Sequence, residues 1–397
     1  MTAPLGPDGN LRRYQVIVGA TSALFWVPTV VLFFIEEFGL GDALKLQAIY
    51  YLAVVLAEVP SGWFSDRVGR VPTLRLVAVW WTGAFSAFLV ADDFAVAALG
   101  QVLLAIGYAF LSGTDVTFHY DSLEALGRED EFEHRESIVR RNGMIVRAAS
   151  VIVGGALGMV SLRLPYAAAL AGALVLGAAT TRLHEPARRV GHGRFRTDIA
   201  ATIRLFRERL LGWILIYVIA QVILEHLASE FAGPYLAELL DEDITDVERA
   251  PLITGVLAAF VSLVGAASVR RAPWLRQRLG LVGALTAVAL IPAATVVAMA
   301  TITAGSVVVL LALRNVQSGI AGVLIPAAVG QRVDPHQRAT FLSFTSLGGR
   351  LAYGTVLLSL SRVAGFDNTL DWAAVVAIGA VLAVAATATV VAERPQE

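Results

Sequence analysis

Apolar stretches of about 20 residues recur along the whole chain, separated by short polar turns. A stretch of this length crosses the hydrocarbon core of a bilayer as a helix, because the backbone groups inside a bilayer must be satisfied within the segment itself. The 397 residues are 57% hydrophobic and 16% charged, whereas a soluble domain carries about 25% charge. The sequence therefore predicts an all-α membrane protein.

We predict twelve transmembrane helices, at 14–38, 46–66, 72–91, 95–119, 141–161, 164–182, 211–237, 249–269, 280–303, 306–330, 340–362 and 371–391. The one long polar connection, 184–210, divides them six and six. We expect an N-terminal half at 1–183, a cytoplasmic linker and a C-terminal half at 211–397. Apolar residues at helical spacing over 199–210 favour an amphipathic helix on the membrane surface, and a solvated linker helix is the alternative.

The basic residues indicate which side of the membrane each connection faces. With the N-terminus inside, the inner segments carry 24 of the 31 Lys and Arg residues, and the outer loops carry four. We therefore expect a multi-pass protein of the cell (inner) membrane with both termini cytoplasmic. The polar first residues lack an apolar region and cleavage site, so no cleavable signal peptide is expected.

The segment between the second and third spans, PSGWFSDRVGR at 60–70, is a cluster of charge between two apolar stretches. Glu58, Gly62 and Asp66 are four residues apart and share one stripe of the second helix. We expect Asp66 to accept hydrogen bonds from the N-terminal amides of a facing helix, where the helix dipole favours an anion. The alternative is that these charges only fix topology and solubilise a tight turn.

The run GWFSDRVGR at 62–70 resembles the signature loop of the major facilitator superfamily. A weaker copy, VGAASVRRAPWLRQRLG at 264–280, keeps the basic residues and a closing glycine but lacks the aspartate. LAEVPSG at 56–62, together with SGTD and YDSL within 112–123, resembles a prokaryotic branch of the superfamily that is associated with efflux.

This resemblance implies the major facilitator fold, in which two six-helix pseudo-repeat halves give alternating access to a central site. It implies that the signature loop holds the halves together in the outward-facing state by contact with the eleventh helix. Asp121, on the fourth span, resembles the second acid of the family, and the resemblance implies a charge relay with Asp66 and Arg70. The implied gating residues are Gly62, Asp66, Arg67, Gly69, Arg70 and Asp121.

Ionisable residues within a span cost several kcal/mol to insert, so each indicates a functional role. Glu58, Arg147 and Asp115 lie roughly 12, 9 and 6 Å from the inner surface at the helical rise of about 1.5 Å per residue. We therefore expect an inner cluster in which Arg147 keeps both acids ionised. His119, where the resemblance implies an apolar residue, is either part of a proton relay or a satisfied polar residue near the headgroups.

In the C-terminal half, Glu225 lies about 21 Å from the inner end of its span. Arg314 and Arg350 lie within reach of Glu225 or Glu230 in depth. We predict that Glu225 is the central proton or cation site and that an arginine is its counter-charge. The alternative is a static pair that stabilises the helix bundle.

Four residues are candidates for lining a substrate cavity: Trp26, Tyr108, Tyr217 and Gln221. Tyr217 and Gln221 share a polar stripe with Glu225. Aromatic rings suit an amphipathic solute, although lipid-facing or interfacial positions are the alternative for each. The glycine-rich fifth span, with Gly154 among its residues, loosely resembles the antiporter motif of the superfamily but lacks the proline of that motif.

The sequence contains no cysteine, no phosphate-binding P-loop and no histidines at metal-ligand spacing. We predict a secondary active transporter, without cofactor or metal, for proton-coupled efflux (antiport) of small amphipathic organic molecules. Its expected partners are the small-molecule substrate, protons and the lipid bilayer; it is expected to be a monomer without nucleic-acid binding. The alternatives are a proton symporter or uniporter for a polar nutrient or organic anion, and a lipid flippase. A membrane enzyme is disfavoured because the sequence shows no nucleophile–base or metal set.

Overall fold

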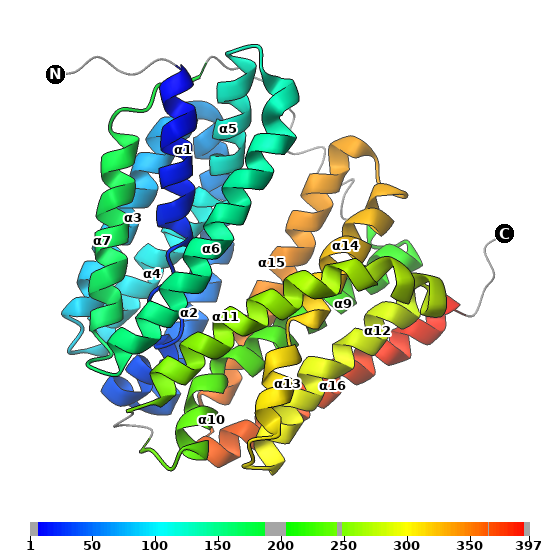
Figure 1. The fold of residues 1–397 in the computed structure, drawn as a ribbon. Coiled ribbons are helices and arrows are strands. Elements are labelled where there is room, and N and C mark those ends of the chain that lie inside the picture. The colour runs from blue at the N-terminus through cyan, green and yellow to red at the C-terminus, as the bar shows by residue number, and fades with distance from the viewer. Residues whose placement is uncertain (1–6, 187–203, 244–247, 364, 393–397) are drawn as a thin grey trace. The chain divides into compact units, whose positions relative to one another are not determined.

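The computed structural model describes residues 7–186, 204–243, 248–363 and 365–392 (Figure 1). The predicted amphipathic helix at 199–210 begins outside the described residues. In chain order the helices are α1 (Pro7–Ser22), α2 (Val30–Val68), α3 (Arg70–Leu89), α4 (Phe94–Leu111), α5 (Thr114–Glu124), η1 (Glu129–Glu131), α6 (Phe132–Gly158), α7 (Leu164–Thr180), α9 (Arg209–Glu230), α10 (Ala232–Leu239), α11 (Ala250–Ser268), η2 (Val269–Arg271), α12 (Ala272–Thr301), α13 (Val307–Leu313), α14 (Val316–Gly330), α15 (Pro335–Leu360) and α16 (Phe366–Ala392).

Helices occupy each of the twelve predicted segments over most of its described length. Within the described residues, six helical segments are long and apolar enough to cross a membrane: Val30–Glu58, Phe94–Glu124, Arg209–Leu239, Ala250–Thr301, Val307–Gly330 and Phe366–Thr389. The segment Ala250–Thr301 covers two of the predicted spans. Two long helices bend sharply at glycines with positive φ: α2 at Gly39 (φ 77°) and α12 at Gly280 (φ 69°).

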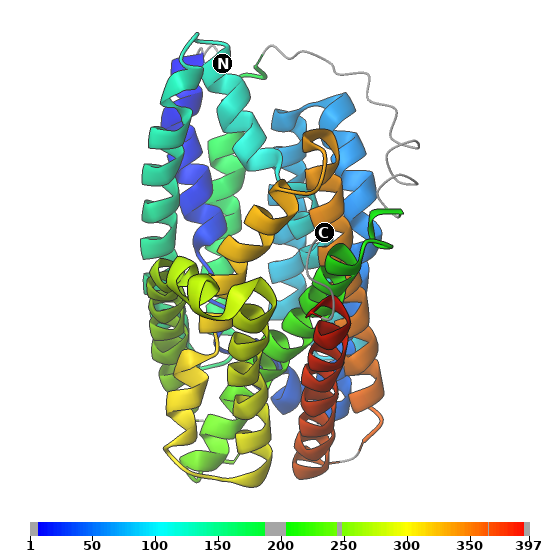
Figure 2. The same ribbon diagram turned by 90° about the vertical axis from the view of Figure 1, so that its right-hand side faces the viewer.

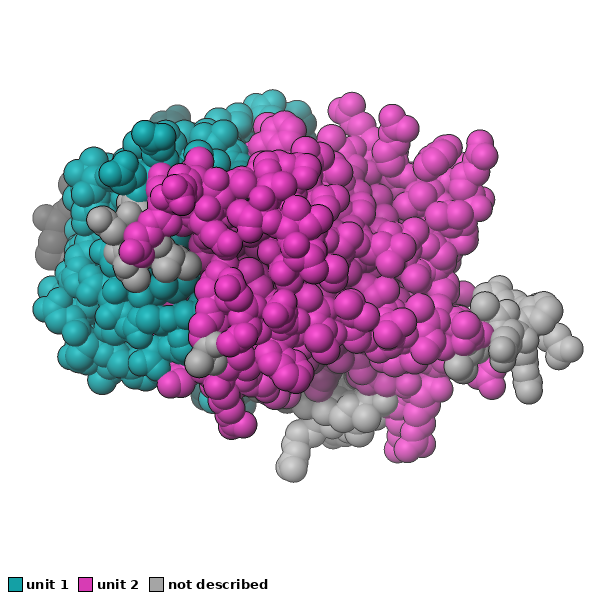
Figure 3. Space-filling view, turned by 90° about the horizontal axis from the view of Figure 1, so that it is seen from below, with its two compact units in different colours: residues 1–42, 49–191, 245–259 teal, residues 43–48, 192–244, 260–397 magenta. Residues whose placement is uncertain are grey.

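The chain forms two compact units, which are coloured separately in Figure 3. Unit 1 comprises Met1–Asp42, Ile49–Gly191 and Thr245–Ala259. Unit 2 comprises Ala43–Ala48, His192–Ile244 and Phe260–Glu397. Unit 1 thus includes the beginning of α11, and unit 2 includes one short piece of α2.

In unit 1, α3 packs against α4 and α7, and α1 packs against α5, α6 and α7. The core is aromatic. Phe33, Phe88 and Tyr166 are fully buried, and the Tyr166 ring lies 4.9 Å from Phe33 and 5.0 Å from Phe88, centroid to centroid. Tilted aromatic pairs at this separation add about 0.5–1.5 kcal/mol each to the free energy gained by burial.

The glycines of the fifth predicted span allow backbone-to-backbone packing in unit 1. A side chain at Gly154 would clash with the Phe25 carbonyl, and a Cβ at Gly155 would lie 2.5 Å from the Pro251 carbonyl oxygen. Small residues permit such close approach between membrane helices. Gly154 and Gly155 thus give α6 close contact with the turn before α2 and with the start of α11.

In unit 2, α12 packs against α16, α14 and α9, and α9 also packs against α15 and α16 (Figures 1 and 2). Trp213 and Tyr217 on α9 are buried. The indole Nε1 of Trp213 donates a hydrogen bond of 3.2 Å to the Val384 carbonyl on α16. This bond satisfies the only polar atom of a large buried side chain.

Candidate functional site

The charged segment at 60–70 contains the end of α2, a one-residue turn and the start of α3. The turn is Gly69, with φ 135° and ψ 160°. A Cβ at this position would lie 2.9 Å from Cδ of Glu185. The backbone conformation therefore favours glycine at position 69.

The Glu185 carboxylate caps the N-terminus of α3. Its two oxygens accept hydrogen bonds of 2.8 Å from the backbone amides of Arg70 and Val71. These amides have no partner within the helix, and the helix dipole favours an anion beside them. Asp66 is the residue predicted to cap a helix in this way; at the start of α3 the capping acid is Glu185. The available signal in the sequence is one glutamate at the start of the polar linker 184–210.

We expect Glu185→Ala to lower the thermal unfolding temperature by about 2–6 °C, since a capping acceptor contributes about 0.5–2 kcal/mol. Glu185→Gln is the matched variant. Its neutral amide oxygen still accepts a hydrogen bond, so its unfolding temperature should fall by about half as much as that of Glu185→Ala. Unfolding of the purified protein in detergent, followed by circular dichroism, measures both variants. Equal unfolding temperatures for Glu185→Ala and the wild type would contradict the capping role.

Arg70 lies at the centre of the predicted gating residues. Its guanidinium is 2.9 Å from Asp66 and 3.6 Å from Asp121, and it donates a 2.7 Å hydrogen bond to Ser65. The Arg70 side chain is 15% exposed and that of Asp66 is 71% exposed. The structure thus brings the three residues of the predicted relay together.

The other residues of the motif lie along the exposed face of α2. Gly62 is exposed, with open space where a side chain would lie. The Arg67 guanidinium lies 5.0 Å from the centre of the exposed Trp63 ring. Glu58, which precedes Gly62 on the same helix, is half-buried and accepts a 3.4 Å hydrogen bond from the Ser112 hydroxyl.

A second group of charges lies where α1, α5 and α6 meet. Arg140 donates to Asp115 at 2.8 Å and to Glu136 at 2.6 Å. Glu136 also accepts a 3.0 Å hydrogen bond from the Tyr14 hydroxyl and contacts His119 Nδ1 at 2.7 Å. The His119 ring stacks on Tyr14, with centroids 4.2 Å apart. We call these five residues the Arg140 cluster.

The Arg140 cluster corrects the predicted pairing of Arg147 with Asp115. Arg147 is exposed and, among the described residues, makes no ion pair with Asp115. Asp115 and His119 were predicted from the sequence, and the structure places both in the cluster. Three residues of the cluster were not predicted from the sequence: Tyr14, Glu136 and Arg140. Glu136 and Arg140 precede the apolar span of their helix.

In unit 2, Glu225 lies half-buried on α9. Within the described chain its carboxylate makes no hydrogen bond or ion pair, although it interacts electrostatically with Arg314 and His226. Arg314 is buried, and its Nη1 atom has no hydrogen-bond partner among the described residues. Arg350 on α15 interacts electrostatically with His226. Arg314 therefore lies within electrostatic range of Glu225 on α9, and Arg350 lies within range of His226 on the same helix.

Glu230 is buried one turn further along α9 and accepts a 2.7 Å hydrogen bond from Gln47. Among the cavity candidates, Tyr217 is fully buried and its hydroxyl accepts a 3.4 Å hydrogen bond from Gln317. Gln221, one turn from Tyr217, is half-buried.

The two cavity candidates of unit 1 are both half-buried. Trp26 lies in the non-helical stretch between α1 and α2. The ring of Tyr108 packs against Trp81, with centroids 4.8 Å apart, and edge-on to Tyr50 at 6.2 Å. The half-buried Tyr51 continues this aromatic group.

No family model matches the sequence, and no curated protein matches it. Solved structures are similar in fold over nearly the whole chain. The nucleoside transporter NupG gives a TM-score of 0.80 at 14% identity, covering 97% of this chain and 100% of its own. A bacterial homologue of the iron transporter ferroportin gives a TM-score of 0.70 at 17% identity, and the match covers 98% of each chain. A D-xylose-proton symporter gives a TM-score of 0.68 at 13% identity, and the match covers 96% of each chain.

The chain has the major facilitator fold. With apolar helices long enough to cross a bilayer, it is an integral, multi-pass membrane protein.

Four predicted spans of this major facilitator fold are interrupted helices. The first is non-helical within 23–29, the fourth breaks at Gly113 (φ 74°), the seventh at Phe231 and the tenth at Arg314. Spans one and seven, and spans four and ten, occupy corresponding places in the two predicted halves. Interruptions at corresponding places are typical of binding sites in transporters with internal repeats. Asp115 and Arg314 both lie at such breaks.

Proposed function

We propose that this protein is a secondary active transporter that works by alternating access and exchanges protons for a small amphipathic organic molecule. Its direction is efflux. The supporting observation is the position of its buried ionisable side chains, Asp115 and Arg314, at helix breaks within a fold shared with solute transporters. A bilayer protein retains such costly side chains where they bind ions or substrate.

The two candidate acids for proton coupling, Asp115 and Glu225, differ in their charged partners. Asp115 is tied to Arg140 by an ion pair. Glu225 has an arginine within electrostatic range but no hydrogen bond or ion pair in the described chain. An acid with a nearby positive charge but no direct partner can exchange a proton without first breaking a salt bridge. Glu225 is therefore the proposed coupling residue.

The amphipathic nature of the proposed substrate follows from the aromatic group around Tyr108. Its tyrosines, Tyr50, Tyr51 and Tyr108, are half-buried and present both a ring and a hydroxyl. Such side chains bind a solute that has one apolar and one polar face.

One observation favours a second candidate, a symporter for an organic anion. The buried Arg314 guanidinium has a nitrogen without a hydrogen-bond partner among the described residues. A carboxylate or phosphate on a substrate would satisfy it, because guanidinium groups bind these anions in a bidentate manner. The two candidates differ in the sign of the coupling between proton and substrate.

Proteoliposomes containing the purified protein distinguish the two candidates. We expect amphipathic organic compounds to accumulate when the lumen is more acidic than the medium, because antiport exchanges luminal protons for substrate. Accumulation of organic anions when the medium is the more acidic side would support symport instead. A panel of dyes, nucleosides, sugars and organic anions, tested under both gradients and with a proton ionophore as control, covers these outcomes. Accumulation that is indifferent to gradient and ionophore would refute proton coupling.

A further inference from the structure

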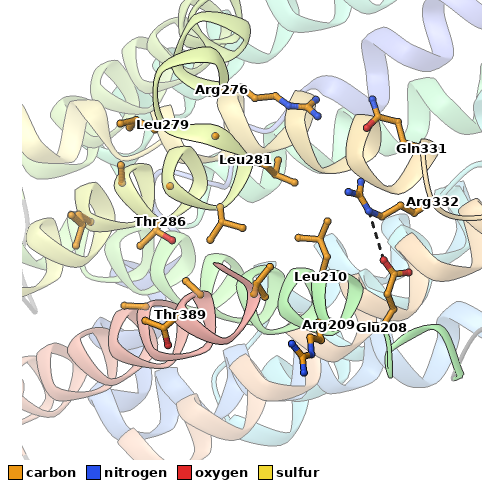
Figure 4. A pocket seen from close by; sticks show the side chains of 18 residues that line it. Glu208, Arg209, Leu210, Arg276, Leu279, Leu281, Thr286, Gln331, Arg332 and Thr389 are labelled. Atoms are coloured by element: carbon orange, nitrogen blue, oxygen red, sulfur yellow. Dashed lines mark ion pairs between the residues drawn. The ribbon is translucent and has the colours of Figure 1, made fainter. Parts of the chain in front are cut away.

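A large pocket in unit 2 is separate from the candidate functional residues described above. It has a volume of about 1280 Å³ and lies where the first turn of α9, the α12 bend at Gly280, the end of α14 and the last turns of α16 meet (Figure 4). All of these helix ends are predicted on the cytoplasmic side. The pocket therefore lies at the level where lipid headgroups meet water.

The charged residues of the pocket gather at one end. Figure 4 shows Arg276, Arg332 and Glu208 on the same side of the pocket, with Gln331 between the two arginines. Arg209 also lines the pocket, but its side chain points away from Arg276 and Arg332. Arg332 is 3.6 Å from Glu208, the one acid in the lining. Three arginines against one glutamate leave an excess of positive charge, which suits an anion.

The other end of the pocket is apolar and opens sideways. Leu279 and Leu290, both on α12, are about half exposed although they line the pocket. Leu290 is ten residues beyond Gly280, so the apolar wall extends roughly 15 Å along the helix, away from the charged end. The pocket thus has basic side chains at one end and an apolar wall beyond them.

The short helix before Gly280 has the character of a membrane-surface segment. Its Trp274 is exposed, and Arg278 lies over the Trp274 ring at 5.7 Å. Tryptophan is enriched at the level of the headgroups. Arg276 on the same helix faces the pocket instead.

We propose that this pocket binds one anionic glycerophospholipid from the adjoining leaflet. The phosphate lies between Arg276 and Arg332, and an acyl chain follows the apolar wall past Leu290. Basic pockets between membrane helices bind anionic headgroups. The apolar wall distinguishes this site from one for a free anion, because a soluble phosphate compound would leave the wall unoccupied.

Native mass spectrometry of the full chain in detergent, titrated with phosphatidylglycerol or phosphatidylethanolamine, tests this proposal. We expect preferential binding of phosphatidylglycerol, with about a five-fold loss of affinity for each of Arg276→Ala and Arg332→Ala. Arg278→Ala is the matched control: it removes an equal charge from the same helix, outside the pocket, and should leave the affinity unchanged. Ala287→Phe should also weaken binding, because it fills the apolar wall while keeping every arginine.

The outcomes are distinct. Equal losses for Arg276→Ala and Arg278→Ala, or equal binding of both lipids, would show general attraction to the basic surface and overturn the proposal. Competition by glycerol phosphate, combined with full affinity in Ala287→Phe, would identify a site for a soluble anion and also overturn it. Arg276→Lys, which retains the charge, together with circular dichroism of each variant, separates lost binding from lost folding.

Discussion

Arg140→Ala is expected to destabilise unit 1 by about 2–4 kcal/mol, which would lower the thermal unfolding temperature by at least about 4 °C. The substitution leaves Asp115 and Glu136, whose side chains are only 9% and 14% exposed, without their shared cation. A buried carboxylate without its partner is costly, because water no longer solvates it. The lower part of this range allows for Arg140 itself being 43% exposed and partly screened by solvent.

Arg147→Ala is the matched control for this prediction. It removes an arginine from the same helix, but an exposed one without an ion pair to Asp115 in the described chain, so its effect should stay within about 0.5 kcal/mol. Adding Asp115→Asn to Arg140→Ala should restore more than half of the loss, because the acid then carries no charge to compensate. Similar unfolding temperatures for the Arg140 and Arg147 variants would contradict the assigned pairing.

The pH dependence of stability follows from Glu136. Burial raises the pKa of its carboxyl. The hydrogen bonds from His119 and Arg140, together with the Arg140 charge, lower this pKa by more than burial raises it, so the net pKa lies below the ordinary 4.5. A lowered pKa stabilises the folded state at neutral pH, and this contribution is lost as pH falls through the folded-state value. In Arg140→Ala the Arg140 hydrogen bond and charge that lower this pKa are absent, so less of the stability depends on an ionised Glu136. The variant should therefore lose less stability than the wild type as the pH falls below the ordinary pKa of this carboxyl.

The error over Arg147 shows what the sequence can and cannot specify. Arg140 and Arg147 are seven residues apart, nearly two helical turns, so they lie on similar faces of α6 about 10 Å apart along its axis. Spacing therefore predicted the face correctly. The depth depends on how far α6 extends beyond the apolar span, and apolarity alone does not determine that extension. Glu136 was not predicted as a site residue for the same reason, since it also lies on the part of α6 that precedes the apolar span.

The helices themselves were predictable because a bilayer leaves the chain few alternatives. Glycines stand at two helix boundaries: Gly69 separates α2 from α3, and Gly113 separates α4 from α5. The break at Gly113 lies within a span predicted as continuous, and the breaks at Phe231 and Arg314, which carry no glycine or proline at the break itself, were not predicted either. The capping of α3 by Glu185 joins residues 115 positions apart in sequence. Such a contact depends on tertiary packing that no local pattern encodes.

The second large effect is expected from Glu225→Gln. If Glu225 carries the coupling proton, this substitution should reduce gradient-driven accumulation in proteoliposomes at least about 100-fold, a loss of some 2.7 kcal/mol in driving the coupled step. Exchange of labelled for unlabelled substrate across the membrane needs no net proton movement and should persist. The amide is close in shape to the acid, and Glu225 makes no hydrogen bond or ion pair in the described chain, so folding should be little affected.

Glu230→Gln is the matched control, on the same helix and one turn away. Glu230 is buried and accepts a 2.7 Å hydrogen bond from Gln47, which a glutamine oxygen can also accept. Its replacement should leave gradient-driven transport within a few-fold of the wild type, because Glu230 has the role of a packed hydrogen-bond acceptor. Transport that keeps its full dependence on the proton gradient in Glu225→Gln, but loses it in Glu230→Gln, would transfer the coupling role to Glu230. Loss of exchange as well as accumulation in Glu225→Gln would instead show that Glu225 binds the substrate, since exchange requires binding and reorientation but no coupled proton.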